Sequence, residues 1–327
     1  MLYPLTFHPI FKERIWGGRR LASLYGKELP TGQTIGESWE ITDRPEGVSE
    51  IANGPLAGRN LRWLMEQHGA EVLGRPVNPG ERFPWLIKIL DCEDDLSLQV
   101  HPPARLAAEL KGEPKTEMWF VAAAEPGAKL YVGLKSGVTR ADFERAIADG
   151  SVAGCFHVVP VQAGDTMFVP SGRVHALGRG NVIFEIQQNS DTTYRVFDWN
   201  RVGLDGRPRE LHVAQSLASI DFADFEPGLV DSVWQPDGPA QSRELVRHEL
   251  FHIHHLRLPA AGRLSVNPAQ PGTIVLAVTA GTVEVTGEFG ATAVPAGGFC
   301  LLPASVPAVQ IRAVGTAEFL RVAPPKR

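Results

Sequence analysis

The stretch Gly164–His175, GDTMFVPSGRVH, decides the fold. Its apolar residues Met167–Val169 are typical of a buried strand, and the Pro-Ser-Gly that follows them turns the chain sharply. His175 then stands beyond the turn, at the start of the next strand. The pattern predicts a strand, a tight turn and a histidine at the start of a second strand.

An earlier segment carries more side chains that bind metals. In the extended stretch Ser97–His101, SLQVH, successive side chains alternate between faces, so Ser97, Gln99 and His101 share one face. Lys115 and Glu117 share a face in the same way. Two separate strands therefore offer an imidazole, an amide and a carboxylate.

The sequence predicts one metal site built from Gln99, His101, Glu117 and His175. Two imidazoles, a carboxylate and an amide suit a first-row divalent ion. Alternatively, His101 and His175 are ordinary hydrogen-bonded histidines on half-buried strands. That alternative is weaker for the whole set, because each unpaired polar group in an apolar barrel costs about 1–3 kcal/mol.

The two segments together resemble the paired signatures of cupin barrels. The predicted fold is mainly β, with two cupin (jelly-roll) barrels, a few short helices and a degenerate second barrel. Its 33 glycines and 26 prolines punctuate short β-branched and aromatic runs, as in all-β proteins. Helical patterns are confined to residues 60–73, 102–110, 139–149 and 210–219.

The second barrel is expected to lack a metal site. Residues 221–238, rich in Asp, Pro and Gly, predict a boundary between a catalytic metal-binding domain at 1–225 and a C-terminal domain at 226–327. Residues 297–308 align with the Gly164–His175 pattern and place Ala308 where His175 stands. The run His252–His255 is interpreted as a strand with exposed histidines rather than as metal ligands. One divalent metal per chain is expected.

Composition excludes several classes of partner. A formal net charge of −5 and a pI near 6.1 provide no broad cationic field, so no nucleic-acid partner is expected. No apolar run reaches membrane-spanning length, and the first 16 residues lack the apolar core of a signal peptide. Cys92, Cys155 and Cys300 are far apart, which indicates buried free thiols. We expect a cytoplasmic chain with no membrane partner; its oligomeric state is left open.

Further motifs narrow the resemblance from cupins to one family. The chain resembles the short bacterial form of type I mannose-6-phosphate isomerase (phosphomannose isomerase) over most of its length. Besides the segments above, the resemblance rests on these blocks: Ile15–Gly18 (IWGG), Gly36–Trp39 (GESW), Phe83–Lys88 (FPWLIK) and Phe184–Trp199 (FEIQQNSDTTYRVFDW).

The resemblance implies a zinc enzyme that interconverts mannose 6-phosphate and fructose 6-phosphate, with a small-molecule sugar phosphate as its partner. The family's zinc ligands fall on Gln99, His101, Glu117 and His175. Its substrate-binding and catalytic residues fall on Trp16, Lys88, Ser97, Lys115, Glu185, Arg195 and Arg201. At Arg201 longer family members commonly carry lysine; arginine keeps the charge and offers a two-pronged grip on phosphate.

The chemistry of such a site requires one stabilised negative charge and one shuttled proton, because the proton moves between C1 and C2 through an enediolate. Glu185 is the candidate proton shuttle; the alternative is a salt bridge to Arg195 or Lys115. Arg195 would polarise the carbonyl or the enediolate. Lys88, Ser97 and Arg201 are candidates for the phosphate, and for each an ordinary ion pair or surface contact is the alternative.

Two other functions remain open at this level. Two histidines and a carboxylate also form the metal site of non-haem iron oxygenases. Gln99 as a fourth ligand and the surrounding cations count against that hypothesis. A non-catalytic sugar-phosphate-binding cupin is the second alternative.

Overall fold

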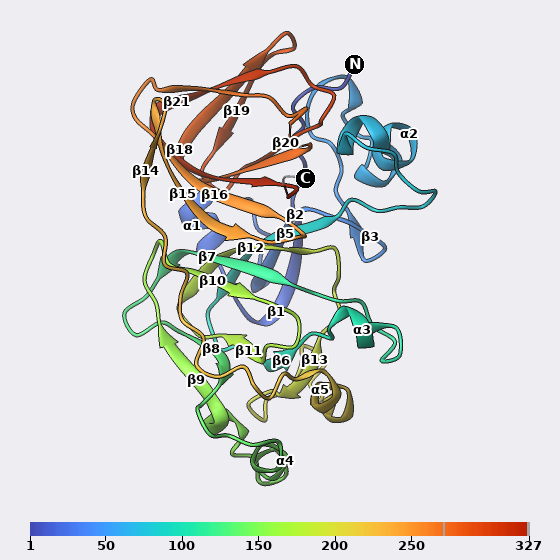
Figure 1. Ribbon diagram of the computed structural model, residues 1–327, viewed down its shortest axis with the longest axis vertical. Coiled ribbons are helices and arrows are strands. Elements are labelled where there is room, and N and C mark those ends of the chain that lie inside the picture. Colours follow the sequence, from blue (N-terminus) through green and yellow to red (C-terminus); the bar gives the residue numbers. More distant parts are fainter. Residues whose placement is uncertain (271, 326–327) are drawn as a thin grey trace.

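The computed structural model describes residues 1–270 and 272–325. It is mainly β with five short helices in these residues, and the predicted fold class is confirmed (Figure 1). The helices are α1 (Arg20–Tyr25), α2 (Leu61–Leu73), α3 (Ala104–Ala107), α4 (Arg140–Asp149) and α5 (Val213–Ser219). None of the described helices is long and apolar enough to cross a membrane.

The first barrel consists of two antiparallel sheets. The six-stranded sheet has the order β1 (Ile10–Gly18), β2 (Ile35–Ile41), β5 (Trp85–Cys92), β12 (Asn181–Gln188), β7 (Glu117–Ala124) and β10 (Thr166–Val169). The five-stranded sheet has the order β13 (Tyr194–Phe197), β6 (Leu98–Val100), β11 (His175–Leu177), β8 (Lys129–Leu134) and β9 (Phe156–Pro160). A small pair, β3 (Asp43–Arg44) and β4 (Gly47–Val48), stands apart.

The C-terminal sheet lies above the first barrel in Figure 1, in orange and red. Its order is β14 (Gln235–Asp237), β15 (Ala240–Arg247), β16 (His252–Leu258), β21 (Val309–Ala323), β18 (Ile274–Gly287) and β19 (Gly290–Pro295), with β17 (Arg263–Val266) on β21 and β20 (Phe299–Leu302) on β18. The N-terminal segment returns to this sheet, where Leu5 and Leu301 form a β-bridge. The division at residue 225 stays a prediction.

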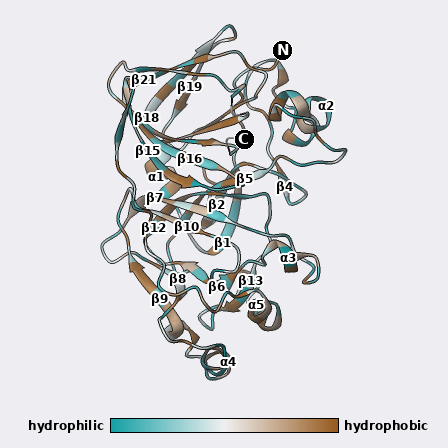
Figure 2. Cartoon of the chain, viewed as in Figure 1, coloured by the Kyte–Doolittle hydropathy of each residue, from teal (hydrophilic) through white to brown (hydrophobic). Residues whose placement is uncertain are grey.

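The six-stranded sheet is buried on both faces, and alternation along each strand assigns the side chains. On β12, Phe184 and Ile186 join the core shared with the C-terminal sheet, whereas Ile183 faces the interior of the first barrel. Phe184 stacks on Phe299 with 5.5 Å between ring centroids. Hydrophobic and hydrophilic residues are accordingly interleaved along the strands (Figure 2). Glu185 is therefore turned into the first barrel.

Helix ends follow local chemistry where the sequence pattern was strong. Asn60 caps α2 by accepting a 2.8 Å hydrogen bond from the Trp63 N–H, and Thr139 forms a capping box with Asp142 at the start of α4. Two predicted helices are shorter than expected: residues 102–110 form only the single turn of α3, and α5 begins at Val213 rather than near residue 210. Helix α1 was not predicted.

The histidine run of residues 252–255 corrects one expectation. It does lie in a strand, β16, but its side chains are not exposed: His252 and His255 are buried and His254 is half-buried. Packing of the C-terminal sheet against the first barrel covers His255, whose ring centroid lies 4.9 Å from that of Phe120 on β7.

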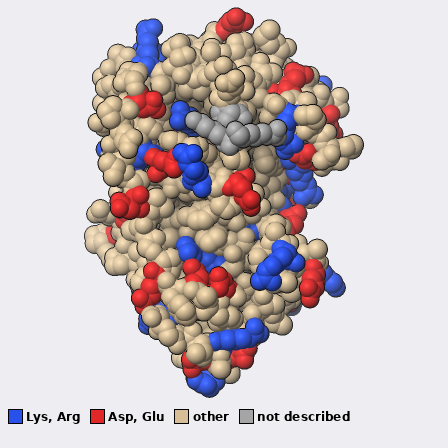
Figure 3. Space-filling model, in the orientation of Figure 1, with Lys and Arg blue, Asp and Glu red and all other residues tan. Residues whose placement is uncertain are grey.

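The three cysteines are buried free thiols, as predicted. On the face drawn in Figure 3, basic and acidic side chains are interspersed among neutral ones.

Candidate metal centre and its cavity

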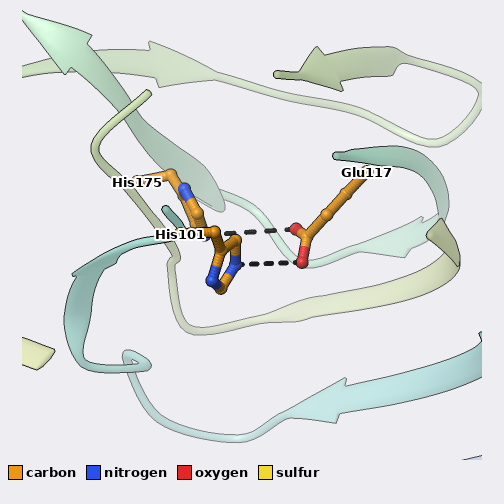
Figure 4. Close-up of side chains that lie close together, drawn as sticks. All are labelled: His101, Glu117 and His175. Carbon is orange, nitrogen blue, oxygen red and sulfur yellow. Dashed lines mark ion pairs between the residues drawn. The ribbon is translucent and has the colours of Figure 1, made fainter. Parts of the chain in front are cut away.

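Three of the predicted ligands meet inside the first barrel. His101 follows β6, His175 begins β11 directly opposite Gln99, and Glu117 begins β7 in the other sheet. Nε2 of His101 lies 3.1 Å from Oε1 of Glu117, and Nε2 of His175 lies 4.0 Å from Oε2 (Figure 4). All three side chains are about 1% exposed. The turn after β10 and the pairing of β6 with β11 thus converge on one point.

The outer nitrogen of each imidazole is already used. Nδ1 of His101 is 2.7 Å from the Thr192 carbonyl, and Nδ1 of His175 is 2.9 Å from the Arg173 carbonyl. A carbonyl only accepts, so each Nδ1 carries the hydrogen and each Nε2 presents a lone pair to the other ligands. Burial lowers the pKa of His101 to about 3 and lowers that of His175, which keeps both rings neutral.

The polar atoms left unsatisfied fit a cation. Both carboxylate oxygens of Glu117 and Nε2 of His101 are buried without a hydrogen bond, although Nζ of Lys115 lies 2.5 Å from Glu117 Oε1. Burial opposes ionisation of Glu117, but the charge of Lys115, followed by the interaction with the His101 side chain, holds its pKa well below the usual range. Three converging lone-pair donors with no hydrogen between them suit a divalent ion.

Gln99 completes the predicted set. Its amide nitrogen lies 3.3 Å from Nε2 of His175, and its amide oxygen accepts a 3.2 Å hydrogen bond from Ser97. Rotating the amide by half a turn directs the oxygen at the centre and leaves the nitrogen as a donor to Ser97. All four predicted ligands therefore lie within reach of one ion.

A cavity of about 570 Å³ opens beside this centre. It is lined by Gln99 of the ligand set and by six of the seven residues predicted for substrate and catalysis: Trp16, Lys88, Ser97, Lys115, Glu185 and Arg195. The seventh, Arg201, is not part of the lining; its guanidinium pairs with Asp198 at 3.1 Å and with Asp94 at 2.9 Å. A cavity of this size accommodates a hexose phosphate.

The buried ammonium of Lys88 lies close to three carboxylates in the cavity. It lies 3.3 Å from Glu37, 3.6 Å from Glu185 and 3.6 Å from Asp191. Burial opposes its charge, but these carboxylates raise the pKa of Lys88 above its usual value. Glu37 stays ionised because Lys88 and Arg14 hold its pKa well below the usual range against the effect of burial.

Glu185 is the exception among these carboxylates. Burial and the nearby charge of Glu117 raise its pKa to about 7, although Lys115 and Lys88 oppose the rise. One oxygen accepts a 3.0 Å hydrogen bond from the Trp119 indole, and the other has no hydrogen-bond partner. A buried carboxyl whose pKa lies near neutrality is suited to take up and release protons.

Three arginines gather at another part of the site. Arg209 binds Asp198 through Nε at 2.6 Å and Nη2 at 2.5 Å, and Arg201 binds the same carboxylate. Arg195 lies close enough that burial and the charge of Arg209 lower its pKa, and its Nε is buried without a partner. Arg195 and Arg209 line the cavity, so two guanidinium groups lie in its wall there.

The sequence analysis did not single out six charged residues that line this cavity: Glu13, Arg14, Glu37, Asp191, Asp205 and Arg209. Glu37 was within reach, because it lies in the GESW block and alternates with Trp39, whose indole donates to it at 2.6 Å. Asp191 was within reach too, because it lies in the Phe184–Trp199 block. The other four carry no local pattern. Their positions depend on how β1 and the segment after β13 fold over the barrel.

Comparisons with known proteins point to one family. The model of the type I phosphomannose isomerase catalytic domain matches residues 5–129. The mannose-6-phosphate isomerase of Streptococcus mutans is 35% identical over 94% of this chain and 94% of its own. The crystal structure of the mannose 6-phosphate isomerase from Bacillus subtilis has a TM-score of 0.89 and 31% identity, covering 98% of this chain and 99% of that one. A crystal structure of zinc-bound mannose 6-phosphate isomerase shares the fold, with a TM-score of 0.76, 17% identity, and coverage of 99% of this chain and all of that one.

Proposed function

This chain belongs to the type I phosphomannose isomerases, and from that premise we propose that it interconverts mannose 6-phosphate and fructose 6-phosphate. The observation that carries the proposal is the position of Glu185, a buried carboxyl with a pKa of about 7, in the cavity beside the buried set His101, Glu117 and His175. We propose zinc as the ion held there, with Gln99 as the fourth ligand, because the donors match those that zinc prefers. When bound, a divalent ion supplies positive charge that favours an enediolate oxygen.

Glu185 is the proposed proton shuttle. It removes the hydrogen on C2 of the aldose and returns a proton to C1 of the enediolate, which gives the ketose; the reverse order gives the aldose. Its free oxygen has no competing hydrogen bond, and Trp119 fixes the other one. Lys115 stands beside Glu117 and is positioned to exchange a proton with the substrate hydroxyls. Lys88 stabilises the ionised form of Glu185.

The phosphate is proposed to bind beside two arginines of the cavity wall. Arg195 and Arg209 line the cavity there, and Arg195 retains an unpaired N–H. A phosphate dianion satisfies that donor and reduces the repulsion between the guanidinium groups. Arg201 stays a prediction for this role: it shares Asp198 with Arg209 and so orients the arginine that lines the cavity. Arg195 would then serve the phosphate rather than the carbonyl, while Ser97 and Trp16 complete the wall.

A coupled assay on mannose 6-phosphate with the zinc-loaded chain tests the proposal. We expect turnover to fructose 6-phosphate, and in D₂O we expect deuterium at the C1 or C2 position, because Glu185 exchanges its proton with solvent. Binding without turnover would instead favour the non-catalytic sugar-phosphate cupin. Oxygen consumption by iron-loaded protein, without isomerisation, would favour the oxygenase.

A cytoplasmic location remains part of the proposal, because free thiols are typical of reducing compartments.

A further inference from the structure

A second group of metal-binding side chains lies in the C-terminal sheet. His252 and His254 are two residues apart on β16 and share a face, and Glu244 of β15 lies directly opposite His254. Nε2 of His252 lies 2.7 Å from Oε2 of Glu244 and 3.0 Å from Nε2 of His254, and Nε2 of His254 lies 3.9 Å from the same Oε2. Three ligand atoms from two adjacent strands thus face one point.

The hydrogens around this point are too few for the acceptors. Ser242 lies 3.2 Å from Nδ1 of His254 and can accept its hydrogen; in that tautomer Nε2 of His254 presents a lone pair. That lone pair and the Glu244 carboxylate both face the single possible N–H of His252.

The spacing resembles that of the first centre. Ligand atoms about 2.0–2.1 Å from a tetrahedral ion lie roughly 3.3–3.5 Å apart. The distances here, 2.7 to 3.9 Å, surround that value, as the 3.1 to 4.0 Å distances in the first barrel do. His252 is 7% exposed and His254 21%, so two ligands are held by packing, while the 39% exposed Glu244 has room to adjust.

We propose that Glu244, His252 and His254 bind a second first-row divalent metal ion, separate from the centre at His101. Two imidazoles and one carboxylate are ligands that such ions prefer. Glu244 and His254 also line a groove of about 560 Å³ together with Asp231 and Asp237. The sequence-based expectation of a single metal rested on Ala308, which does not belong to this group.

Arg247 competes for the carboxylate. It binds Glu244 through Nε at 3.2 Å and Nη2 at 2.6 Å. The Arg247 side chain is 68% exposed, so its ion pair with Glu244 contributes little to stability. Displacing Arg247 from the carboxylate therefore costs little free energy. Removing the arginine should therefore strengthen metal binding at this site, whereas a purely structural hydrogen-bonded cluster would loosen.

Zinc binding to the full-length chain, measured by equilibrium dialysis with elemental analysis, tests the proposal. We expect two ions per wild-type chain and one fewer in Glu244→Gln and in His254→Ala, with isomerase activity unchanged. His68→Ala is the matched control, since His68 and Glu71 form an exposed imidazole–carboxylate pair 3.0 Å apart on α2. It should keep the wild-type stoichiometry. Equal stoichiometry in wild type and both ligand variants overturns the proposal.

Two graded variants keep the test informative if a ligand variant folds poorly. Ser242→Ala removes only the partner of His254 Nδ1 and should weaken the second ion about 10-fold or more, the effect typical of such supporting contacts. Arg247→Ala should tighten it. Failure of Ser242→Ala to weaken binding together with failure of Arg247→Ala to strengthen it overturns the proposal. None of these residues lines the cavity of the first barrel, so loss of isomerase activity would concern the proposed function alone.

Discussion

Lys88 and Glu185 lie directly opposite each other on the adjacent antiparallel strands β5 and β12, with 3.6 Å between the ammonium and a carboxylate oxygen. Burial raises the pKa of Glu185 to about 7 and the charge of Glu117 adds to the rise, while Lys115 and Lys88 restrain it. This strand pairing thus places the proposed base next to a cation that favours its ionised form near neutral pH.

The pairing predicts how activity depends on pH. The base must be ionised, so kcat should rise as pH increases through the pKa of Glu185. A bound divalent ion favours the ionised carboxylate and should therefore move this rising limb of the pH profile below pH 7. Lys88→Met removes a restraining charge and should move the limb to higher pH. Lys129→Met, a change far more exposed to solvent, is the control for a lysine of the same barrel. If kcat rises at the same pH in Lys88→Met as in the wild type, Lys88 does not influence the pKa of the base.

Loss of a metal ligand should abolish turnover without unfolding the chain. In His101→Ala or His175→Ala the metal loses one of few ligands, so metal content at that centre and nearly all activity should disappear. The extensive core shared by the sheets should keep the circular dichroism spectrum native-like. His157→Ala, a half-buried histidine of β9, is the control. Full activity in a variant depleted of that metal would contradict the assignment.

Steady-state kinetics should separate the base from the phosphate grip. Glu185→Gln keeps the shape and the hydrogen bond from Trp119 but loses the proton acceptor, so kcat should fall about 10²–10⁴-fold with KM little changed. Arg209→Ala should mainly raise KM, with some loss of kcat because the phosphate also positions the reacting carbons. Arg201→Ala should have the smaller effect if it acts through Asp198.

Both outcomes require metal content to be measured in each variant, and it should be unchanged because none of these residues is a ligand. Near wild-type kcat in Glu185→Gln would remove Glu185 from the mechanism. An unchanged KM in both arginine variants would place the phosphate elsewhere in the cavity.

Glu185 should also destabilise the metal-free protein at high pH. Its folded-state pKa of about 7 lies above that of an exposed glutamate, about 4.3, so the unfolded chain releases this proton first. The cost is absent below about pH 4.3, grows between the two values and is complete above pH 7. Glu185→Gln should therefore raise the Tm of metal-free protein at pH 8 and change it little at pH 4.5. An equal change at both values would exclude the buried charge as the cause.

Much of the first centre followed from the sequence because its information is local. Alternation along a strand fixes that Gln99 shares a face with His101, and the Pro-Ser-Gly turn fixes where His175 enters the next strand. These rules act over a few residues. They led to the four proposed ligands and to six further residues that the structure places in the cavity wall.

Tertiary structure decided what depends on distant segments. Whether a carboxyl titrates near pH 4 or near pH 7 depends on its burial and its neighbours. For Glu185 the charged neighbours are Glu117, Lys115 and Lys88, which lie in other segments of the chain. The histidines of β16 were judged exposed because their alternation identifies a face but not what covers it. Only strand pairing brought Glu244 to His254, and only the packing of the C-terminal sheet on the first barrel covered His255. Sequence determined which residues share a face; the assembled sheets determined what each face meets, because contact and solvation depend on segments far apart in the chain.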